Sequence, residues 1–417
     1  MSKRSNILVL AVLAGTGCTD RVTTLTDPDY FPGSLPTTIQ YTLPSEALLG
    51  SMEVVPGRTT IKDAFFKLIA QDFDESLSAH LVAQFNGFPR AVEIGGVSDS
   101  SYTYESSRVV ASLPDTLRVS QSVLEFQLWT ITQPFDSLDV TWQNAIDRPG
   151  ETVAWSTAGG TRGQLLATDT WRMADTGTGA DSLTWEVPAE VVSALADSSL
   201  AGLMVVLNTP TARAEISSLA IEANVRSETR DTVVTQIVHS LAQTYIYTPE
   251  PELPADLLRV GGLTSDRTLF QLRLDNPLQG CAVPTPDCPA QLNLDEVILN
   301  RVELVLEPAP VTRGFRPIAR TRLTFRRLLE PELGPRATLG EVVAGDTVSV
   351  SRFLPSNTQP LVFNLTNMVS AALANGDDEL AFAVLIEPQA STPSYVWMQR
   401  NPRLRFTYTL PQRPQLP

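Results

Sequence analysis

The sequence predicts an all-β protein built from two tandem jelly-roll-like β-sandwich domains, each with one short helix. Short segments in which apolar and polar residues alternate, Pro- and Gly-rich breaks between them, and an internal repeat lead to this prediction. The chain has 31 Pro and 23 Gly among 417 residues, and 43% of its residues are hydrophobic. Such a composition is typical of a globular protein with many short strands and turns.

Alternation marks the predicted strands. Apolar residues take every second place in Leu124–Leu128, Val302–Leu306, Phe270–Leu274 and Leu404–Leu410. Each pattern indicates a strand with one face toward a core and the other toward water. Two sheets that bury these faces against each other form a sandwich.

Helical periodicity is rare in the sequence. Pro188–Ala196 and Asn367–Ala374 are short stretches rich in Ala, Val and Leu, and each predicts about two helical turns. Thr60–Ile69 is a third candidate helix.

An internal repeat divides the body of the chain. Trp185–Asp197 aligns with Phe363–Asn375 at an offset of 178 residues, and the same offset places Leu124–Leu128 on Val302–Leu306. The alternative is two unrelated strand–helix–strand stretches. The repeat predicts a first domain over residues 38–235 and a second over 236–412.

The first 17 residues are typical of a signal peptide. Lys3 and Arg4 precede the apolar run Ile7–Ala14, and small residues follow at positions 15–17. The run is far shorter than the ~20 residues that a membrane span needs.

Cys18 follows this segment directly, and the ending resembles the lipobox of bacterial lipoproteins. That resemblance implies cleavage before Cys18, acylation of its thiol, and membrane attachment. Gly15 departs from the pattern, which usually has Leu there, and plain secretion is the alternative. Residues 18–37 are polar, with Thr, Asp, Pro and Gly, and predict a flexible tether.

Acylation of Cys18 would leave Cys281 and Cys288 as an even pair. In an oxidising compartment we expect them to form a disulfide that closes one short, turn-rich loop. Two free thiols or a metal pair are the alternatives. A metal pair lacks further ligands, because the chain has only three Cys and two His.

The charge of the chain bears on its partners. The formal net charge is −15, and the pI is about 4.7. Nucleic acid and anionic lipid both require a basic face, so neither is an expected partner. The expected partners are the membrane, through the N-terminal lipid, and polysaccharide or other envelope proteins.

Several segments of the sequence resemble the disaggregatase-related (DNRLRE) β-sandwich family. They are Asp139–Asn144 with Pro149 and Trp155, the strand Ser122–Leu128, the helix and strand over Trp185–Leu207, the opening of the second domain over Gln243–Leu272, and its close over Pro402–Tyr408. In the second domain, Thr324–Phe325 stands as a remnant of the Thr141–Trp142 pair. The resemblance implies jelly-roll-like extracellular modules, some of whose relatives bind polysaccharide, without shared catalytic residues. The layout also resembles envelope lipoproteins of unknown function from environmental bacteria.

Catalytic and metal-binding residues are hard to assemble from this sequence. A Ser-His-Asp triad needs a histidine, and His80 and His239 are expected to be structural or solvent-facing. Asp72–Glu75 and Asn375–Glu379 are oxygen-rich turns that do not match an EF-hand loop. We therefore expect no catalytic residue, no metal site and no cofactor.

Four tryptophans are candidates for a sugar-stacking platform. They are Trp142, Trp155, Trp171 and Trp397. The alternative is that these rings are core residues, which large aromatics more often are.

The sequence therefore predicts a lipid-anchored cell-envelope protein, in the outer membrane, with a non-enzymatic structural or adhesion-type role. A pair of carbohydrate-binding modules is the alternative. A glycan-cleaving enzyme, whose paired carboxylates only the fold could reveal, is a weaker one.

Overall fold

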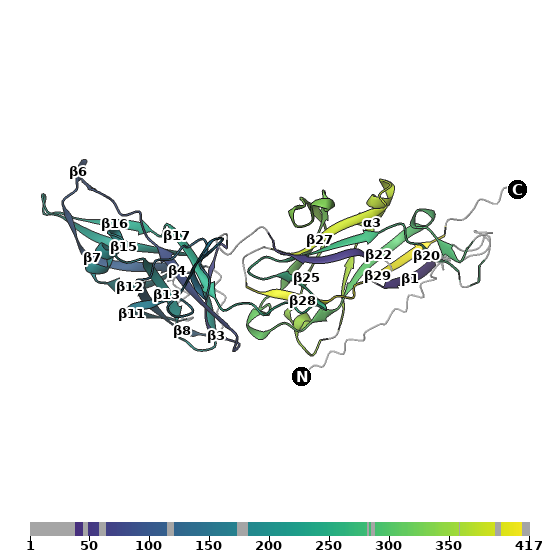
Figure 1. The fold of residues 1–417 in the computed structure, drawn as a ribbon, viewed down its shortest axis with the longest axis horizontal. Coiled ribbons are helices and arrows are strands. Elements are labelled where there is room, and N and C mark those ends of the chain that lie inside the picture. The colour runs from purple at the N-terminus through teal and green to yellow at the C-terminus, as the bar shows by residue number, and fades with distance from the viewer. Residues whose placement is uncertain are drawn as a thin grey trace, which may run out of the picture.

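The computed structural model describes residues 38–44, 49–57, 64–114, 121–172, 182–281, 283–284, 288–357, 359–387 and 393–410. These residues form antiparallel sheets with a few short helices, and the predicted all-β sandwich class is confirmed. Two lobes follow one another along the longest axis (Figure 1). The predicted signal peptide, the tether and Cys18 lie outside the described residues.

Lobe 1 comprises the described residues between 64 and 247. Its larger sheet has the order β11 (Arg162–Arg172), β8 (Val123–Ile131), β13 (Gly202–Leu207), β4 (Leu77–Gln84), β3 (Lys67–Phe73) and β14 (Ala212–Ile216), and β17 (Ala242–Tyr247) also pairs with β4. Its smaller sheet has the order β12 (Ser182–Val187), β7 (Tyr102–Ser112), β15 (Ser218–Ser227) and β16 (Val233–His239). Two hairpins are added, β5–β6 (Val92–Ile94, Val97–Asp99) and β9–β10 (Asn144–Arg148, Glu151–Ala154). Phe126, Trp171 and Trp185 are buried in the core of this lobe.

Lobe 2 comprises the described residues from 38 to 57 and from 257 to 410. One sheet has the order β2 (Leu49–Val55), β19 (Arg267–Arg273), β27 (Glu379–Glu387), β24 (Thr321–Leu328) and β25 (Leu339–Val348). The other has the order β1 (Thr38–Pro44), β29 (Arg403–Thr409), β22 (Ile298–Leu306) and β26 (Leu361–Asn364). Smaller elements are β18 (Leu257–Gly261), β28 (Tyr395–Gln399) and β23 (Pro308–Ala309), the pair β20–β21 (Leu278–Gln279, Gln291–Leu292), and the 3-10 turns η3 (Leu294–Glu296), η4 (Arg313–Phe315), η5 (Pro331–Arg336) and η6 (Val350–Phe353).

Two α-helices stand where the sequence predicts them. They are α2 (Ala189–Ala196) and α3 (Thr366–Ala374), and each buries one apolar side against its lobe. The third predicted helix, Thr60–Ile69, is wrong in its described part, because β3 begins at Lys67. Residues 67–70 are all buried, so this apolar run is a strand covered on both faces.

The repeat is visible in the topology, where it covers more strands than the sequence alignment indicated. The element order β12–α2–β13 corresponds to β26–α3–β27, which confirms the offset around the helices. The alignment of Leu124–Leu128 with Val302–Leu306 is wrong. β8 pairs with β13, and β24 is the strand that pairs with β27 in the same way, whereas β22 pairs with β26. Thr324–Phe325 therefore corresponds to β8 rather than to the Thr141–Trp142 pair. The hairpin β9–β10 lengthens the connection after β8, and this extra chain shifts the offset.

The predicted domain boundaries need a correction at both ends of lobe 1. β1 pairs with β29 and β2 pairs with β19, so residues 38–55 complete the sheets of lobe 2 (Figure 1). The predicted boundary at 235 cuts through β16 and places β17 in the second domain. In the structure β16 pairs with β15 and β17 pairs with β4, and both partners belong to lobe 1. The strands β1–β2 thus hold in lobe 2 the position that β16–β17 hold in lobe 1. An edge strand joins whichever open edge fits its alternating face, and chain proximity does not decide this.

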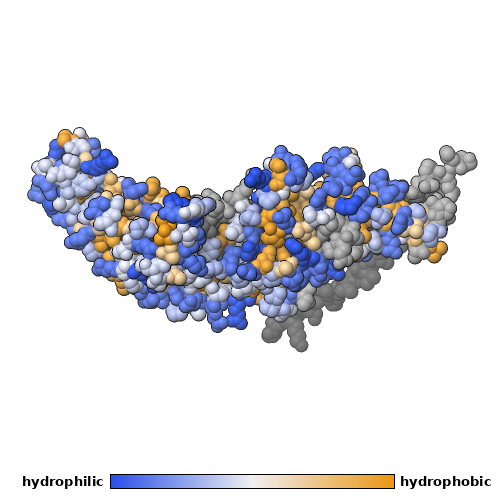
Figure 2. Space-filling view, in the orientation of Figure 1, coloured by the Kyte–Doolittle hydropathy of each residue, from blue (hydrophilic) through white to orange (hydrophobic). Residues whose placement is uncertain are grey.

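The two lobes share a small apolar core. Its members from lobe 1 include Phe73, Leu77, Ala79 and Tyr245, and those from lobe 2 include Leu257, Leu263, Phe315, Tyr395 and Trp397. The Gly314 backbone N–H donates to Ser76 Oγ across this interface at 2.8 Å. A Cβ at Gly314 would lie 2.8 Å from the Phe73 carbonyl oxygen, so the backbones approach too closely for a larger residue there. Outside this contact, the visible face is mostly hydrophilic, with scattered apolar patches (Figure 2).

Candidate functional site

The predicted disulfide is confirmed. Cys281 and Cys288 are bonded, with their Cα atoms 5.6 Å apart, and Cys288 is buried against the core of lobe 2. Cys18 lies outside the described residues, so its acylation remains a prediction.

The four predicted platform tryptophans lie in four different environments. Trp171 is in the core of lobe 1, Trp397 is in the apolar core between the lobes, and Trp155 packs against the outer face of the larger lobe 1 sheet. These three rings are at most 8% exposed, so they offer no surface for stacking. Only Trp142 of the four is half-buried.

His80 packs beside Trp142. Its ring centroid lies 4.9 Å from that of Trp142. Nδ1 lies 2.6 Å from the carbonyl oxygen of Gly159, and Nε2 lies 3.3 Å from Arg162 Nη2. Because the guanidinium can only donate, Nε2 accepts and the proton is assigned to Nδ1. Burial lowers the pKa of His80 to about 4, so the ring is neutral at pH 7, and a structural role fits this environment. His239, on β16, is exposed.

The Trp142 side chain is held in place by the segment that carries it. The Trp142 carbonyl accepts from the Gly159 backbone N–H at 2.7 Å, and the Trp155 indole donates to the Thr141 carbonyl at 3.0 Å. Gly159 has a φ of +86°, and a Cβ there would lie 2.8 Å from the Trp142 ring. These hydrogen bonds fix the chain between β8 and β11. One side of the Trp142 indole packs against Gly159 and His80.

A pocket of about 330 Å³ opens beside Trp142 at the junction of the lobes, and we call it the junction pocket. One side of its wall comes from lobe 1. Pro249 and Glu250 follow β17, and Thr264 lies in the β18–β19 turn of lobe 2. The lining residues are Val140, Thr141, Trp142, Gln143, Tyr247, Pro249, Glu250 and Thr264. Two aromatic rings, hydroxyls, an amide and a carboxylate therefore converge on one small space.

An ion-pair network fixes the lobe 2 side of the junction pocket. Arg259 lies 3.0 Å from Glu250 through Nη1 and 2.5 Å from Asp266 through Nε. The other oxygen of Glu250 accepts from the Leu263 backbone N–H at 2.9 Å, and Thr264 Oγ1 donates to Asp266 at 2.6 Å. Burial raises the pKa of Glu250, although the Leu263 hydrogen bond and Arg259 oppose this. The sequence reasoning missed these residues, since only the Pro-rich run Thr248–Pro254 marks the segment.

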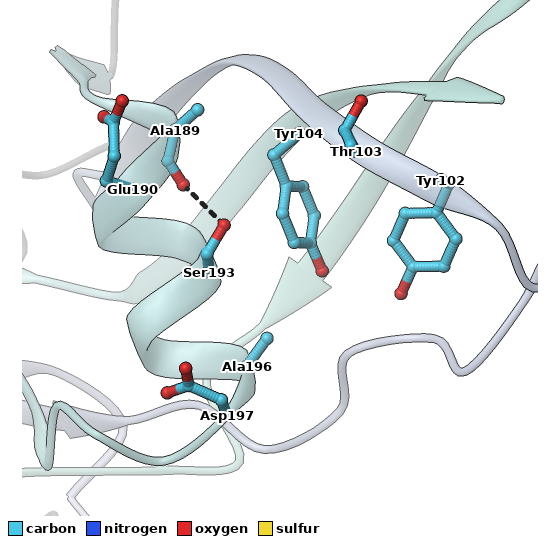
Figure 3. A pocket seen from close by; sticks show the side chains of 8 residues that line it. All are labelled: Tyr102, Thr103, Tyr104, Ala189, Glu190, Ser193, Ala196 and Asp197. Carbon is cyan, nitrogen blue, oxygen red and sulfur yellow. Dashed lines mark hydrogen bonds between the residues drawn. The ribbon is translucent and has the colours of Figure 1, made fainter. Parts of the chain in front are cut away.

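A second hollow, of about 590 Å³, lies between β7 and α2 of lobe 1. The rings of Tyr102 and Tyr104 project from β7 on the same side, with Tyr104 the nearer to the helix (Figure 3). Three of its polar side chains already serve the local structure. Ser193 donates to the Ala189 carbonyl, Tyr102 to the Pro89 carbonyl, and Asp197 accepts from the Ser199 backbone N–H. This groove is therefore a weaker candidate than the junction pocket.

Metal-binding clusters are absent from the part of the chain that the structure describes, where no three His, Cys, Asp or Glu side chains gather to hold an ion. The arrangement at the junction pocket is suited to non-covalent recognition, with rings for apolar contact and fixed polar groups for orientation.

Comparisons with known proteins add no identity. No protein-family model matches the chain, and no curated protein matches it. Among solved structures, broad bean stain virus matches at 10% identity with a TM-score of 0.14, over 87% of this chain and 95% of that one. The T13 IBDV viral particle also matches at 10% identity and a TM-score of 0.14, over 89% of this chain and 69% of that one. Similarities of this strength carry no argument about function.

Proposed function

We propose that this chain is an envelope lipoprotein, cleaved before Cys18 and acylated there, with a non-enzymatic structural or adhesion-type role at the outer membrane. The order of basic residues, short apolar run, small residues and cysteine at positions 3–18 carries the proposal. The confirmed disulfide supports an oxidising compartment, because such bonds are rare in reducing ones. No helix among the described residues is both long and apolar enough to cross a bilayer.

Replacing the acylated cysteine tests this proposal. In cells fed an alkyne-tagged fatty acid, the wild-type chain should take up label and sediment with membranes. Cys18→Ala should lose the label and leave the membrane fraction, because one cysteine carries the whole anchor. Cys281→Ala is the matched control, since it removes a cysteine of the disulfide and should keep the label. Labelling and membrane retention that survive Cys18→Ala would contradict the proposal.

Carbohydrate binding is the second candidate function. Trp142, one of the four predicted rings, is half-buried and lines the junction pocket. The other three rings are buried, so support for this function comes from one pocket rather than from a row of exposed tryptophans.

A further inference from the structure

We propose that the junction pocket binds one end of a neutral or amino-sugar saccharide, with a sugar ring lying against Trp142. This inference deepens the carbohydrate-binding candidate by giving it a site and a ligand class. It does not depend on acylation of Cys18.

The aromatic surface of the pocket is already organised for a ligand. His80 and Gly159 back the Trp142 indole, and Gly159 lacks the Cβ that would displace it. His80 is neutral, so no buried charge next to the ring needs a counter-ion. A ring held in one orientation loses little conformational freedom when a ligand stacks on it.

The polar groups around the ring suit a polyhydroxylated ligand. Tyr247 and Gln143 contribute a phenol and an amide to the lining, and the Thr264 hydroxyl, which donates its proton to Asp266, can still accept a hydrogen bond. Burial raises the pKa of Tyr247, so its hydroxyl stays protonated and can donate. A pocket with two aromatic rings and several oriented polar groups matches the common plan of small-molecule sites.

The size and charge of the pocket narrow the ligand class. A volume of about 330 Å³ is at the lower end of the ~300–1,000 Å³ range of ligand pockets, which favours a chain end over a long internal stretch. Glu250 lines the pocket and shares Arg259 with Asp266, so this network beside the pocket has two carboxylates for one guanidinium. The whole chain has a net charge of −15. Polyuronates and sulfated glycans are therefore disfavoured.

The test measures saccharide binding to the full chain by isothermal titration calorimetry. The probes are cellotetraose, tetra-N-acetylchitotetraose and its deacetylated form chitotetraose, with tetragalacturonate as the anionic comparison. We expect at least one of the first three to bind with a Kd of about 1 mM or tighter, and tetragalacturonate to bind at least tenfold more weakly. Failure of all three to bind, or a preference for tetragalacturonate, would overturn the proposal.

Variants then locate the site. Trp142→Ala should weaken binding at least tenfold, and Trp142→Phe should restore most of it, because an aromatic face remains. Gln143→Ala changes only an exposed side chain of the lining, so it should fold normally and still weaken binding several-fold. Tyr104→Ala is the matched control, because Tyr104 is also a half-buried ring of lobe 1 but lines the other hollow and not the junction pocket. Equal affinity in the wild-type chain, Trp142→Ala and Gln143→Ala would overturn the proposal, and so would equal losses in Tyr104→Ala and Trp142→Ala.

Discussion

His80 joins the stability of lobe 1 to the shape of the junction pocket. The imidazole fills the space behind Trp142 and contacts the Gly159 carbonyl, while Arg162 donates to its second nitrogen. The Arg162 contact requires the neutral ring, because Nε2 must accept, whereas Nδ1 can donate to Gly159 in either protonation state. A proton on His80 would place a second cation next to Arg162 in a buried position, which is costly.

Acid should therefore destabilise the protein through His80. The folded-state pKa is about 4, below the 6.5 of the unfolded chain, so the unfolded chain binds more protons between these values. Stability is fully present above about pH 6.5 and is lost progressively as the pH falls toward about 4. The loss should reach at most about 3.5 kcal/mol at ~1.4 kcal/mol per pKa unit. The measurement is the midpoint of urea unfolding at a series of pH values.

Two variants separate His80 from the other titrating groups. His80→Gln lowers stability at every pH but should flatten the loss between pH 6.5 and 4. His239→Gln removes the exposed histidine of β16 and should leave the slope of the wild-type chain. An unchanged slope in His80→Gln would show that other groups cause the acid loss.

At the scale of elements, β1 is the strand whose role differs most from its place in the chain. Leu43 is 4% exposed and belongs to the core of lobe 2, although β18, with which the rest of that lobe begins, lies more than 200 residues further along the sequence. Its hydrogen-bonding partner is β29, close to the C-terminus.

Leu43→Ala should therefore destabilise lobe 2 rather than lobe 1. A buried Leu→Ala change costs about 2–5 kcal/mol, through lost burial and the cavity that remains. Hydrogen–deuterium exchange should speed up in β22 and β29 and stay unchanged in β7 and β15. Thr42→Ala, at the exposed neighbouring position, is the matched control and should change neither lobe. Faster exchange confined to lobe 1 would contradict the strand pairing.

Local elements were the part of this fold that could be predicted. The helices near residues 189 and 366 and the alternating strands follow from periodicity, and cysteine parity was enough to predict the disulfide. The edge strands β1–β2 were assigned to the wrong lobe, because pairing over such distances leaves no mark on local sequence. The site was predicted only at Trp142. The network of Glu250, Arg259 and Asp266 could not be predicted. Only the fold brings these three charges together, and their spacing in the sequence matches no motif.

At the scale of the whole molecule, the pairing of β1 and β2 with lobe 2 determines which lobe the predicted tether leads into. Residues 18–37 lead directly into β1, and β1 lies toward the end of the long axis that is remote from β6 and β7 (Figure 1). A linear order of domains would place the first domain next to the membrane. The strand pairing instead leads us to predict that, in a chain acylated at Cys18, lobe 2 lies nearest the membrane and lobe 1 is distal.

This orientation can be measured on the acylated chain in lipid vesicles. A dye on Thr42→Cys would report from β1, and one on Ser98→Cys, an exposed position of β6, would report from the far end of lobe 1. A flexible tether of 20 residues spans only about 25 Å on average. An energy acceptor in the vesicle surface should therefore quench the Thr42 dye strongly and the Ser98 dye weakly. The same two labels on a chain with Cys18→Ala are the control and should both escape quenching, because without the lipid neither lobe is held at the surface. Equal quenching at the two positions of the acylated chain would mean that the molecule lies along the membrane, and stronger quenching at Ser98 would reverse the proposed order of the lobes.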